Sequence, residues 1–316
     1  MKPTRLLAVL AATAACALGS ASTAAAATDV SQSSSENWSG YVVGGAGGDS
    51  SYRTVSGSWV VPTAHCSSSR AYSAFWVGLG GAGNTEALEQ AGTEGNCDED
   101  GNASYYAWYE LVPSAPARLN LAVNPGDHIS TRVTVNGTAV AISMTDATTG
   151  LGASKGLTMD DPDTSSAEWI AEAPSSCGAS ASSCTPLPLT DFGTVTFTSA
   201  SATDSGGHTG TISDGAWSTA AVTLTPGADS SGYEGVDIGS SDGSGAAQPS
   251  ALSSDGSSFS VTYSSDGSAA RGAGGGGGPY GNGGYGDGGG GYGPGDGYGY
   301  GYGGHGYGDD GGYSGW

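Results

Sequence analysis

The chain has 316 residues, 59 of them glycine, and a formal net charge of −22, with 30 Asp and Glu against 8 Lys and Arg. So acidic a chain lacks the basic face that nucleic-acid phosphates or anionic lipids require, which excludes both as partners. Charged residues make up only 12% of the chain, about half the globular norm of roughly 25%. The surface must therefore be built mainly from Ser, Thr, Gly and Asn, which favours a secreted protein.

The first residues have the pattern of an export signal. Lys2 and Arg5 give a positive start, an apolar run follows, and small residues lead to a cleavage site after Ala27. We expect 1–27 to be removed and 28–36 to be a short N-terminal segment or a propeptide remnant. No later stretch is long and apolar enough to suggest a membrane span, so we expect no membrane contact after signal removal.

Short alternating runs rich in Val, Thr, Tyr and Trp fill the middle of the chain, separated by Gly, Asn, Asp, Ser and Pro. Asn136-Gly137 lies between two such runs and predicts a tight hairpin turn. With no long amphipathic helix in the pattern, we expect one all-β domain over 37–264, a sandwich or a barrel. The expected strands are Trp38–Val43, Thr54–Val61, Tyr72–Leu79, Ser104–Leu111, His128–Val135, Ala139–Asp146, Ala167–Ala173, Phe192–Thr198, Ala220–Thr225 and Ser258–Tyr263.

The cysteines agree with an oxidising compartment. Cys16 leaves with the signal, and four cysteines remain, which allow three pairings. Cys177 and Cys184 are close in sequence and suit a loop bridge, which would leave Cys66 to pair with Cys97. A Cys-x-x-Cys pair is absent from the sequence, so we expect no structural zinc and no other metal.

The C-terminal segment, residues 265–316, consists largely of Gly and Tyr. It has no apolar period, so burial cannot offset the entropy lost on ordering it. We expect a disordered tail, with binding to a cell wall or a glycan as one role for it.

Familiar catalytic motifs occur only in unsuitable contexts. Gly-x-Ser-x-Gly appears at Gly152–Gly156 and Gly239–Gly243, both in Gly/Ser-rich stretches that we interpret as turns and not as nucleophile elbows. Gly78–Gly83 matches a dinucleotide-binding pattern but lacks the surrounding alternation of strands and helices. Asp98–Asn102 indicates an acidic turn, because Ala103 stands where a calcium loop needs glycine. We therefore expect no cofactor.

Carboxylates and amides near tryptophans are the remaining candidates. Strand alternation puts Glu168 and Glu172 on one face and Trp169 on the other. A carboxylate on the concave face of a sandwich can act as a general acid or base. The residue pattern does not select between this group and a second one, formed by Glu86, Glu89 and Gln90.

Several segments, taken in order, resemble the glutamic peptidases, or eqolisins, between Asn37 and Tyr263. Each segment alone is weakly specific, and their shared order behind an export signal carries the resemblance. The matching segments are Asn37–Tyr41, Gly57–Pro62, Trp76–Gly81, Glu89–Thr93, Tyr106–Glu110, Gly126-Asp127, Ala167–Glu172 and Phe192–Phe197.

The resemblance implies a sandwich of two curved antiparallel sheets, similar to concanavalin, in a secreted, bacterial-type endopeptidase that acts on proteins at acidic pH. The catalytic glutamine of the family then corresponds to Gln90 and its catalytic glutamate to Glu168. The tryptophans of the substrate groove correspond to Trp38 and Trp76, and Glu110 also fits the family pattern as a substrate-binding candidate.

The implied chemistry needs no metal or cofactor. Glu168 would take a proton from water as a general base and return it to the departing nitrogen, while the neutral amide of Gln90 stabilises the oxyanion. Two positions depart from the family pattern. Gly80 stands where an aspartate is common, so a supporting carboxylate is missing, and Ala91 stands where threonine is common.

Two other functions fit parts of the sequence. One is a glycoside hydrolase of similar shape that uses two carboxylates such as Glu168 and Glu172. The other is a carbohydrate-binding or wall-interaction module that uses exposed tryptophans and the tail. For the peptidase we expect a monomer whose partners are protein or peptide substrates.

The charge balance also bears on acid conditions. Once Lys2 and Arg5 leave with the signal, Lys155 is the one lysine left in the chain. Near about pH 3 most carboxylates are neutral, so few positive charges repel one another. We therefore expect the melting temperature to hold or rise between about pH 7 and pH 4.

Overall fold

The structure is a computed structural model that describes residues 30–44, 51–82, 87–177, 184–227 and 245–265. The expected signal and nearly all of the expected tail lie outside these ranges. Within them, the chain forms strands, turns and loops, and no helix that could span a membrane is present.

The strands are β1 (Val30–Ser35), β2 (Trp38–Gly44), β3 (Tyr52–Val60), β4 (Ala74–Gly80), β5 (Leu88–Cys97), β6 (Ala103–Val112), β7 (Ala117–Arg118), β8 (His128–Asn136), β9 (Ala139–Asp146), β10 (Leu151–Thr158), β11 (Ser166–Glu172), β12 (Ser175–Cys177), β13 (Cys184–Pro186), β14 (Thr194–Asp204), β15 (Thr209–Gly210), β16 (Ser218–Leu224), β17 (Ala246–Pro249) and β18 (Phe259–Ser264).

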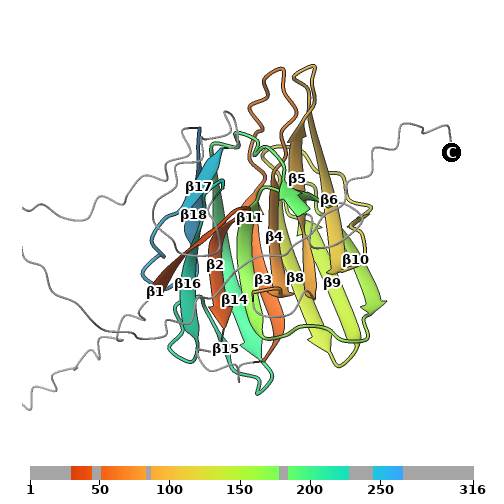
Figure 1. The fold of residues 1–316 in the computed structure, drawn as a ribbon. Coiled ribbons are helices and arrows are strands. Elements are labelled where there is room, and N and C mark those ends of the chain that lie inside the picture. Colours follow the sequence, from red (N-terminus) through yellow and green to blue (C-terminus); the bar gives the residue numbers. More distant parts are fainter. Residues whose placement is uncertain (1–29, 45–50, 83–86, 178–183, 228–244, 266–316) are drawn as a thin grey trace, which may run out of the picture.

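Most of these strands belong to one long sheet that folds back on itself. Its order is β10-β9-β8-β3-β14-β18-β17-β16-β2-β11-β4-β5-β6-β7, and Figure 1 shows it running from β17 and β18 at the left to β10 at the right. The strands from β10 to β18 form a back half, and those from β17 to β7 form a front half. Contacts of β11 with both β3 and β14 show that the halves face each other. The expected sandwich of antiparallel sheets is thus confirmed.

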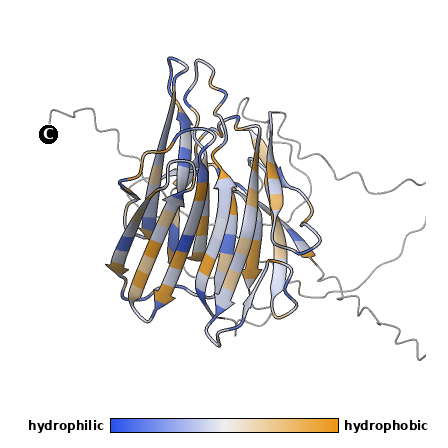
Figure 2. Cartoon of the chain, turned by 180° about the vertical axis from the view of Figure 1, so that it is seen from behind, coloured by the Kyte–Doolittle hydropathy of each residue, from blue (hydrophilic) through white to orange (hydrophobic). Residues whose placement is uncertain are grey.

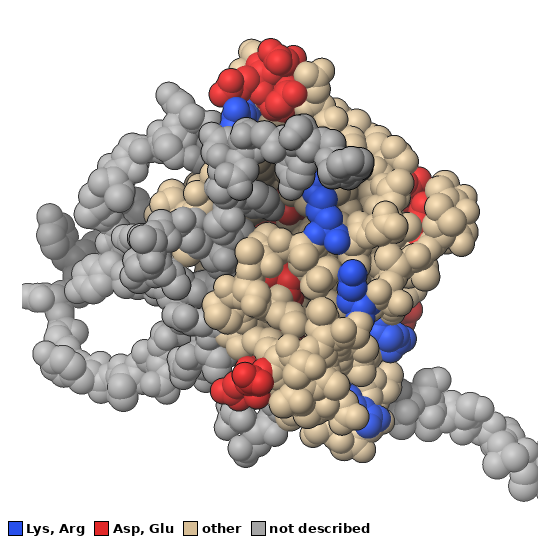
Figure 3. Space-filling model, turned by 90° about the vertical axis from the view of Figure 1, so that its right-hand side faces the viewer, with Lys and Arg blue, Asp and Glu red and all other residues tan. Residues whose placement is uncertain are grey.

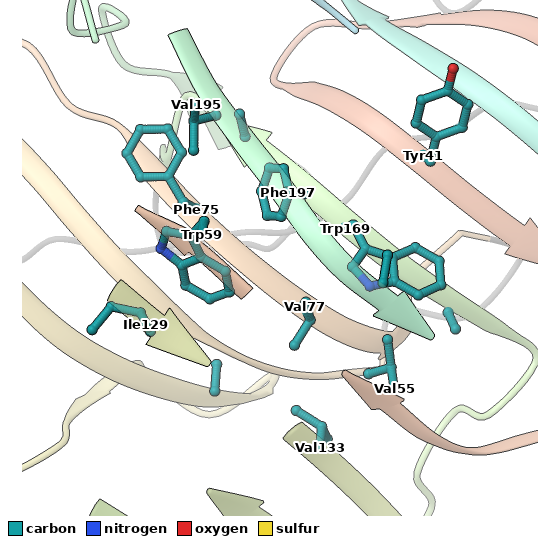
Figure 4. Close-up of a cluster of buried hydrophobic side chains, with 14 of the residues drawn as sticks. Tyr41, Val55, Trp59, Phe75, Val77, Ile129, Val133, Trp169, Val195 and Phe197 are labelled. Atoms are coloured by element: carbon teal, nitrogen blue, oxygen red, sulfur yellow. The ribbon is translucent and has the colours of Figure 1, made fainter. Parts of the chain in front are cut away.

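Large aromatic side chains fill the space between the halves (Figure 4). Trp59 on the back half and Trp169 on the front half are both almost fully buried. Each indole keeps its hydrogen bond, since Trp59 Nε1 donates to Thr93 Oγ1 at 2.9 Å and Trp169 Nε1 to the Ser56 carbonyl at 2.8 Å. Burying each such side chain contributes about 1.5–3 kcal/mol or more, so this core fixes how the halves stack.

The outward side of the back half is a field of hydroxyl groups, which we call the hydroxyl face. Residues along β9 alternate strictly between exposed and buried, and the bands of colour along the strands in Figure 2 show this alternation. In the side view of Figure 3, Asp and Glu gather at the top, a row of Lys and Arg runs down the middle, and much of the remaining described surface is uncharged. The hydroxyl pairs across neighbouring strands are Ser58–Ser130 and Thr196–Ser260 at 2.8 Å, Thr194–Thr262 at 3.1 Å and Thr54–Thr134 at 3.3 Å.

The expected hairpin joins β8 and β9, where Gly137 has the positive φ of 59° that such a tight turn requires. One interpretation was wrong: the motif at Gly152–Gly156 lies in strand β10, which pairs with β9, and not in a turn. The second such motif, Gly239–Gly243, lies outside the described residues. Strand β1 lies within the segment 28–36 and pairs parallel with β16.

Strand β5 was not expected from the sequence, because Leu88–Cys97 contains Gly, Glu and Asn, which are poor strand formers. One end of β5 is tied by a disulfide between Cys66 and Cys97, whose Cα atoms are 5.4 Å apart. In the small sheet of β12 and β13, Cys184 is disulfide-bonded and lies opposite Cys177 in the backbone register.

Candidate active site

Four residues form a row across the front half, which we call the dyad row. The register pairs Glu168 of β11 with Gly78 of β4, Gly78 with Gln90 of β5, and Gln90 with Glu110 of β6. Residues directly opposite one another project from the same face of a sheet. The row therefore brings together three of the residues expected from the sequence, on the face opposite Trp169.

Gly78 separates the two central side chains of the row. Because Glu168 and Gln90 are two strands apart, their backbones are separated by about 9–10 Å. A Cβ atom at residue 78 would come within 2.9 Å of Trp76 Cζ3 and 3.3 Å of Gln90 Cβ. Leu88 Cδ1 would also lie within 3.0 Å, so the side chains of Trp76, Leu88 and Gln90 already fill the space over residue 78, and glycine allows them to pack there.

Glu168 lies completely buried in the front half. Neither of its oxygens has a hydrogen-bond partner among the residues that the structure describes. Burial raises the pKa of this carboxyl well above its usual value. Negative charge on Asp163 and on Glu89 raises this pKa further. A buried carboxyl with a strong affinity for protons is typical of a catalytic acid or base.

Gln90 is also completely buried, and the nitrogen of its side-chain amide already donates a hydrogen bond. Its Nε2 donates to Glu110 Oε2 at 2.8 Å, while Oε1 has no partner within the described part of the chain. The sequence resemblance suggested Glu110 as a substrate-binding residue, and in the structure its carboxylate accepts this hydrogen bond from Gln90. Glu110 therefore orients the amide, and the second N–H of Nε2 stays available to another acceptor.

The two expected groove tryptophans lie together on the same face as the dyad row. Trp38 and Trp76 meet edge to face, with ring centroids 5.0 Å apart. Trp76 Nε1 donates to Glu172 Oε2 at 2.7 Å, and Asn37 Nδ2 donates to Glu172 Oε1 at 3.1 Å. Both carboxylate oxygens of Glu172 thus hold neighbouring side chains in place, and Trp76 is fixed beside Gly78.

A second acidic row runs parallel to the first and was not found from the sequence. It pairs Glu172 with Ala74 and Ala74 with Glu94, which lies opposite Tyr106. Glu94 accepts hydrogen bonds from the Tyr106 hydroxyl and, at 2.7 Å, from Asn96 Nδ2. The signal was available, because Glu94 follows Gln90 at the same spacing at which Glu172 follows Glu168.

Two more acidic residues, Glu89 and Asp163, lie close in the chain to Gln90 and to Glu168. Glu89 points to the other face of β5, where burial raises its pKa to about 8. Its Oε1 accepts a hydrogen bond of 3.2 Å from the backbone N–H of Asp163, a residue that the sequence pattern did not single out. Glu86 lies outside the described residues. Among the described residues, no group of His, Cys, Asp and Glu side chains could hold a metal ion.

The front half thus brings a buried carboxyl, Glu168, and a buried amide, Gln90, to one face of the sheet, two strands apart with Gly78 between them. The peptidase A4 family model matches residues 36–263. Aspergillopepsin-2 of Aspergillus niger is 33% identical over 202 residues, which are 56% of this chain and 67% of that protein. Among solved structures, Scytalido-glutamic peptidase with a peptide-based transition state analog is similar at a TM-score of 0.55 and 26% identity, over 72% of this chain and 98% of that one. The eqolisin SCP-B, in complex with the tripeptide Ala-Ile-His, matches at a TM-score of 0.53 and 25% identity with the same coverage.

The chain belongs to the peptidase A4 family, the eqolisins. It is a glutamic-type acid endopeptidase. This membership confirms the family resemblance carried by the motifs.

Proposed function

We propose that Glu168 and Gln90 are the catalytic residues with which this peptidase hydrolyses peptide bonds of protein substrates. The dyad row carries the proposal, because it holds a buried carboxyl and a buried amide on either side of Gly78. On the same face, both oxygens of Glu172 and Oε2 of Glu94 accept hydrogen bonds from neighbouring side chains.

In the first step, Glu168 removes a proton from a water molecule whose oxygen attacks the peptide carbonyl carbon. Negative charge then develops on the carbonyl oxygen, which accepts a hydrogen bond from the second N–H of Gln90 Nε2. As the tetrahedral carbon expels the nitrogen, the C–N bond breaks and protonated Glu168 gives its proton to that nitrogen. Acid and amine products leave, and Glu168 is ionised again.

The environment of Glu168 makes it a strong base and limits how much of it is ionised in acid. Its raised pKa means that the ionised fraction, and with it kcat/KM, grows as the pH rises along the acidic side of the activity profile. Gln90 does not titrate, so its part in stabilising the oxyanion is independent of pH.

Trp38 and Trp76 pack beside the dyad row in a buried apolar cluster, and we propose that their rings border the space that a substrate side chain enters. The indole Nε1 of Trp38 has no partner within the described residues and can donate to a substrate carbonyl. Two similar proteins were solved with a peptide-based analog and a tripeptide, which supports a peptide as the substrate here.

The decisive experiment is turnover of denatured casein by the purified protein between about pH 2 and pH 5, with chelators and serine-directed reagents present. We expect Gln90→Ala and Glu168→Gln each to lower kcat by about 100-fold or more with the fold intact by circular dichroism. The exposed residues Gln32 and Glu99 provide matched controls, and Gln32→Ala and Glu99→Gln should keep full activity. Full activity in Glu168→Gln would sink the mechanism.

The geometry disfavours the alternative of a glycosidase that uses Glu168 and Glu172. Four residues along a strand separate them by about 13 Å, more than the roughly 5–9.5 Å at which paired carboxyls flank a glycosidic bond. A turnover of polysaccharide that survives Gln90→Ala would favour the glycosidase. Binding of glycan without casein turnover would favour a carbohydrate-binding module.

The wider organisation of the chain is also a proposal. We infer secretion from the signal pattern, with support from the Cys66–Cys97 disulfide, which needs an oxidising compartment. The domain limits 37–264 agree with the range 36–263 of the family match. A monomeric state, wall or glycan binding by residues 265–316 and a bacterial-type subgroup remain predictions. Gel filtration tests the first, and pull-down on insoluble polysaccharide with and without 265–316 tests the second.

A further inference from the structure

Arg118 is an exposed side chain at the edge of the front half, on the same face as the dyad row. In the register of β6 and β7, Arg118 lies opposite Trp108. Residues directly opposite one another project from the same face, and Trp108 packs with Trp76 in the apolar cluster beside the dyad row. Among the described residues, Arg118 is the one Lys or Arg on a strand of the front half.

Arg118 lies against an aromatic ring that is itself held in place. The central carbon of its guanidinium is 4.0 Å from the centre of the Tyr106 ring, which is within the range of cation–π attraction. The Tyr106 hydroxyl donates to Glu94 Oε2, which also accepts a hydrogen bond of 2.7 Å from Asn96 Nδ2. Glu94 is almost fully buried, so the ring beneath Arg118 is anchored in the sheet.

The guanidinium of Arg118 keeps its N–H donors for another group. A cation–π contact uses the positive charge and none of the N–H groups. The ion pairs between described residues involve His65, Arg70 and His208, and none of them involves Arg118. A planar guanidinium that is always charged suits a carboxylate, because two parallel N–H groups match its two oxygens.

The register places two acidic side chains of the same face near Arg118, Glu94 of β5 and Glu110 of β6. Both are buried, and they accept hydrogen bonds from Tyr106 and Gln90 respectively. The nearest basic side chain across β6 is Lys155, whose Nζ lies 6.0 Å from the Tyr109 ring on the other face. Arg118 is therefore the exposed charge that this face presents to a ligand.

The distance between Arg118 and the dyad row fits an extended peptide. Arg118 lies two strands from Gln90 and two residues further along the sheet, which separates the two backbones by about 12 Å. An extended peptide rises about 3.3 Å per residue, so three or four residues cover this distance. A substrate bound at the dyad can therefore reach Arg118 with a nearby residue of its own chain.

We propose that Arg118 is a specificity-determining residue that binds a carboxylate of the peptide substrate, about three or four residues from the cleaved bond. The proposal rests on the assignment of Glu168 and Gln90 as the dyad, and it names the substrates that this dyad prefers. The carboxylate comes from an Asp or Glu side chain or from the free C-terminus of a peptide. A Glu side chain in the substrate loses its charge below about pH 4, so this preference fades in stronger acid.

The experiment compares amidated peptides that carry Glu, Gln or Lys at a single position, from the second to the fifth residue on either side of the cleaved bond. At about pH 5 we expect kcat/KM for the best Glu peptide to exceed that for its Gln counterpart by about fivefold or more, mainly through KM. At about pH 3 the ratio should approach one, because the Glu side chain is then protonated. Gln peptides with a free C-terminus, compared with their amides, show whether a terminal carboxylate is bound in the same way, and either preference supports the proposal.

Two variants test whether Arg118 causes the preference. Arg118→Gln should bring the ratio at about pH 5 close to one, and Arg118→Glu should reverse it in favour of the Lys peptide. Arg132 is exposed on β8 of the back half, so Arg132→Gln is the matched control and should keep the ratio of the parent.

A parent enzyme that makes no distinction at about pH 5, either between Glu and Gln peptides or between free and amidated ends, would overturn the proposal without any variant. An Arg118→Gln variant whose kcat/KM changes equally for both peptides would also overturn it, because a residue that only supports the fold acts on every substrate alike. Activity surviving in Glu168→Gln would instead refute the dyad itself, so the two failures are distinguishable.

Discussion

Glu168 and Glu172 lie on the same strand and the same face, four residues apart, and both are completely buried. Glu172 accepts hydrogen bonds from Trp76 and Asn37, one on each carboxylate oxygen. Neither oxygen of Glu168 accepts one from any residue that the structure describes. The two glutamates therefore share the same face of the sheet and the same burial, and they differ in their hydrogen-bond partners.

The difference shows that burial alone does not give a carboxyl its role. A hydrogen bond to a charged group contributes about 1.5–3 kcal/mol, so Glu172 stabilises the fold and fixes Trp76. A buried carboxyl without such bonds offers no such stabilisation, and the fold tolerates it at a cost. Its proton affinity and its free oxygens are the properties that hydrolysis needs.

The sharpest way to break this comparison is to neutralise each glutamate separately. We expect Glu168→Gln to reduce kcat by about 1000-fold with an unchanged or higher melting temperature, because an amide replaces an unpaired acid. Glu172→Gln should instead lower the melting temperature and raise KM, because its NH₂ group cannot accept from either Trp76 or Asn37. Steady-state kinetics and calorimetry on both variants check this, and equal loss of kcat in the two would erase the distinction.

A substitution at Gly78, which lies between the two proposed catalytic side chains, gives the next effect. We expect Gly78→Ala to lower kcat/KM by about 10- to 100-fold, since the new methyl group pushes against Trp76 and Gln90 and displaces the amide. Gly156 lies on the exposed strand β10, and no described atom comes within 4 Å of the place that a methyl group would take there. Gly156→Ala is therefore the control and should keep its activity. A fully active Gly78→Ala variant would show that catalysis does not require the absence of a side chain at residue 78.

The last comparison concerns stability against pH. The folded-state pKa values of Glu89, about 8, and of Glu168 are raised above the ordinary value of 4.5. Their stabilisation is fully present below about pH 4.5 and is lost as the pH rises through the folded pKa values. For Glu89 this amounts to at most about 5 kcal/mol. The melting temperature should therefore fall from pH 4 to pH 8, in the direction that the charge balance also predicts.

Calorimetry of Glu89→Gln tests this assignment. The variant keeps an acceptor for the N–H of Asp163 and carries no charge, so it should melt several degrees higher than the parent at about pH 8 and nearly equally at pH 4. Glu99→Gln, at an exposed site, should not change the slope. A parent protein whose stability increases from pH 4 to pH 8 would contradict the sign of both pKa shifts.

The sequence allowed the strands rich in Val, Thr and Trp to be placed, and alternation gave the correct faces for Glu168, Glu172 and Trp169. It did not reveal β5, because the backbone pairing that makes Leu88–Cys97 a strand comes from β4 and β6 and not from its own side chains. The dyad row depends on register between segments about 80 residues apart, for which the chain carries no local signal. Asp163 was missed because its side chain binds backbone N–H groups and packs where Gly80 has no side chain, and neither feature leaves a pattern in the sequence.

The hydroxyl face has a consequence for an enzyme of acidic media. Ser and Thr do not titrate, so the hydroxyl pairs from Ser58–Ser130 to Thr194–Thr262 bind water in the same way whether the carboxylates elsewhere are charged or neutral. Solubility that rests on ionised groups fades near the isoelectric point, which lies at about 4.1 for this chain. We expect this sheet of alcohol groups to stay hydrated at that pH and to keep the molecule soluble where a protein coated with carboxylates would precipitate.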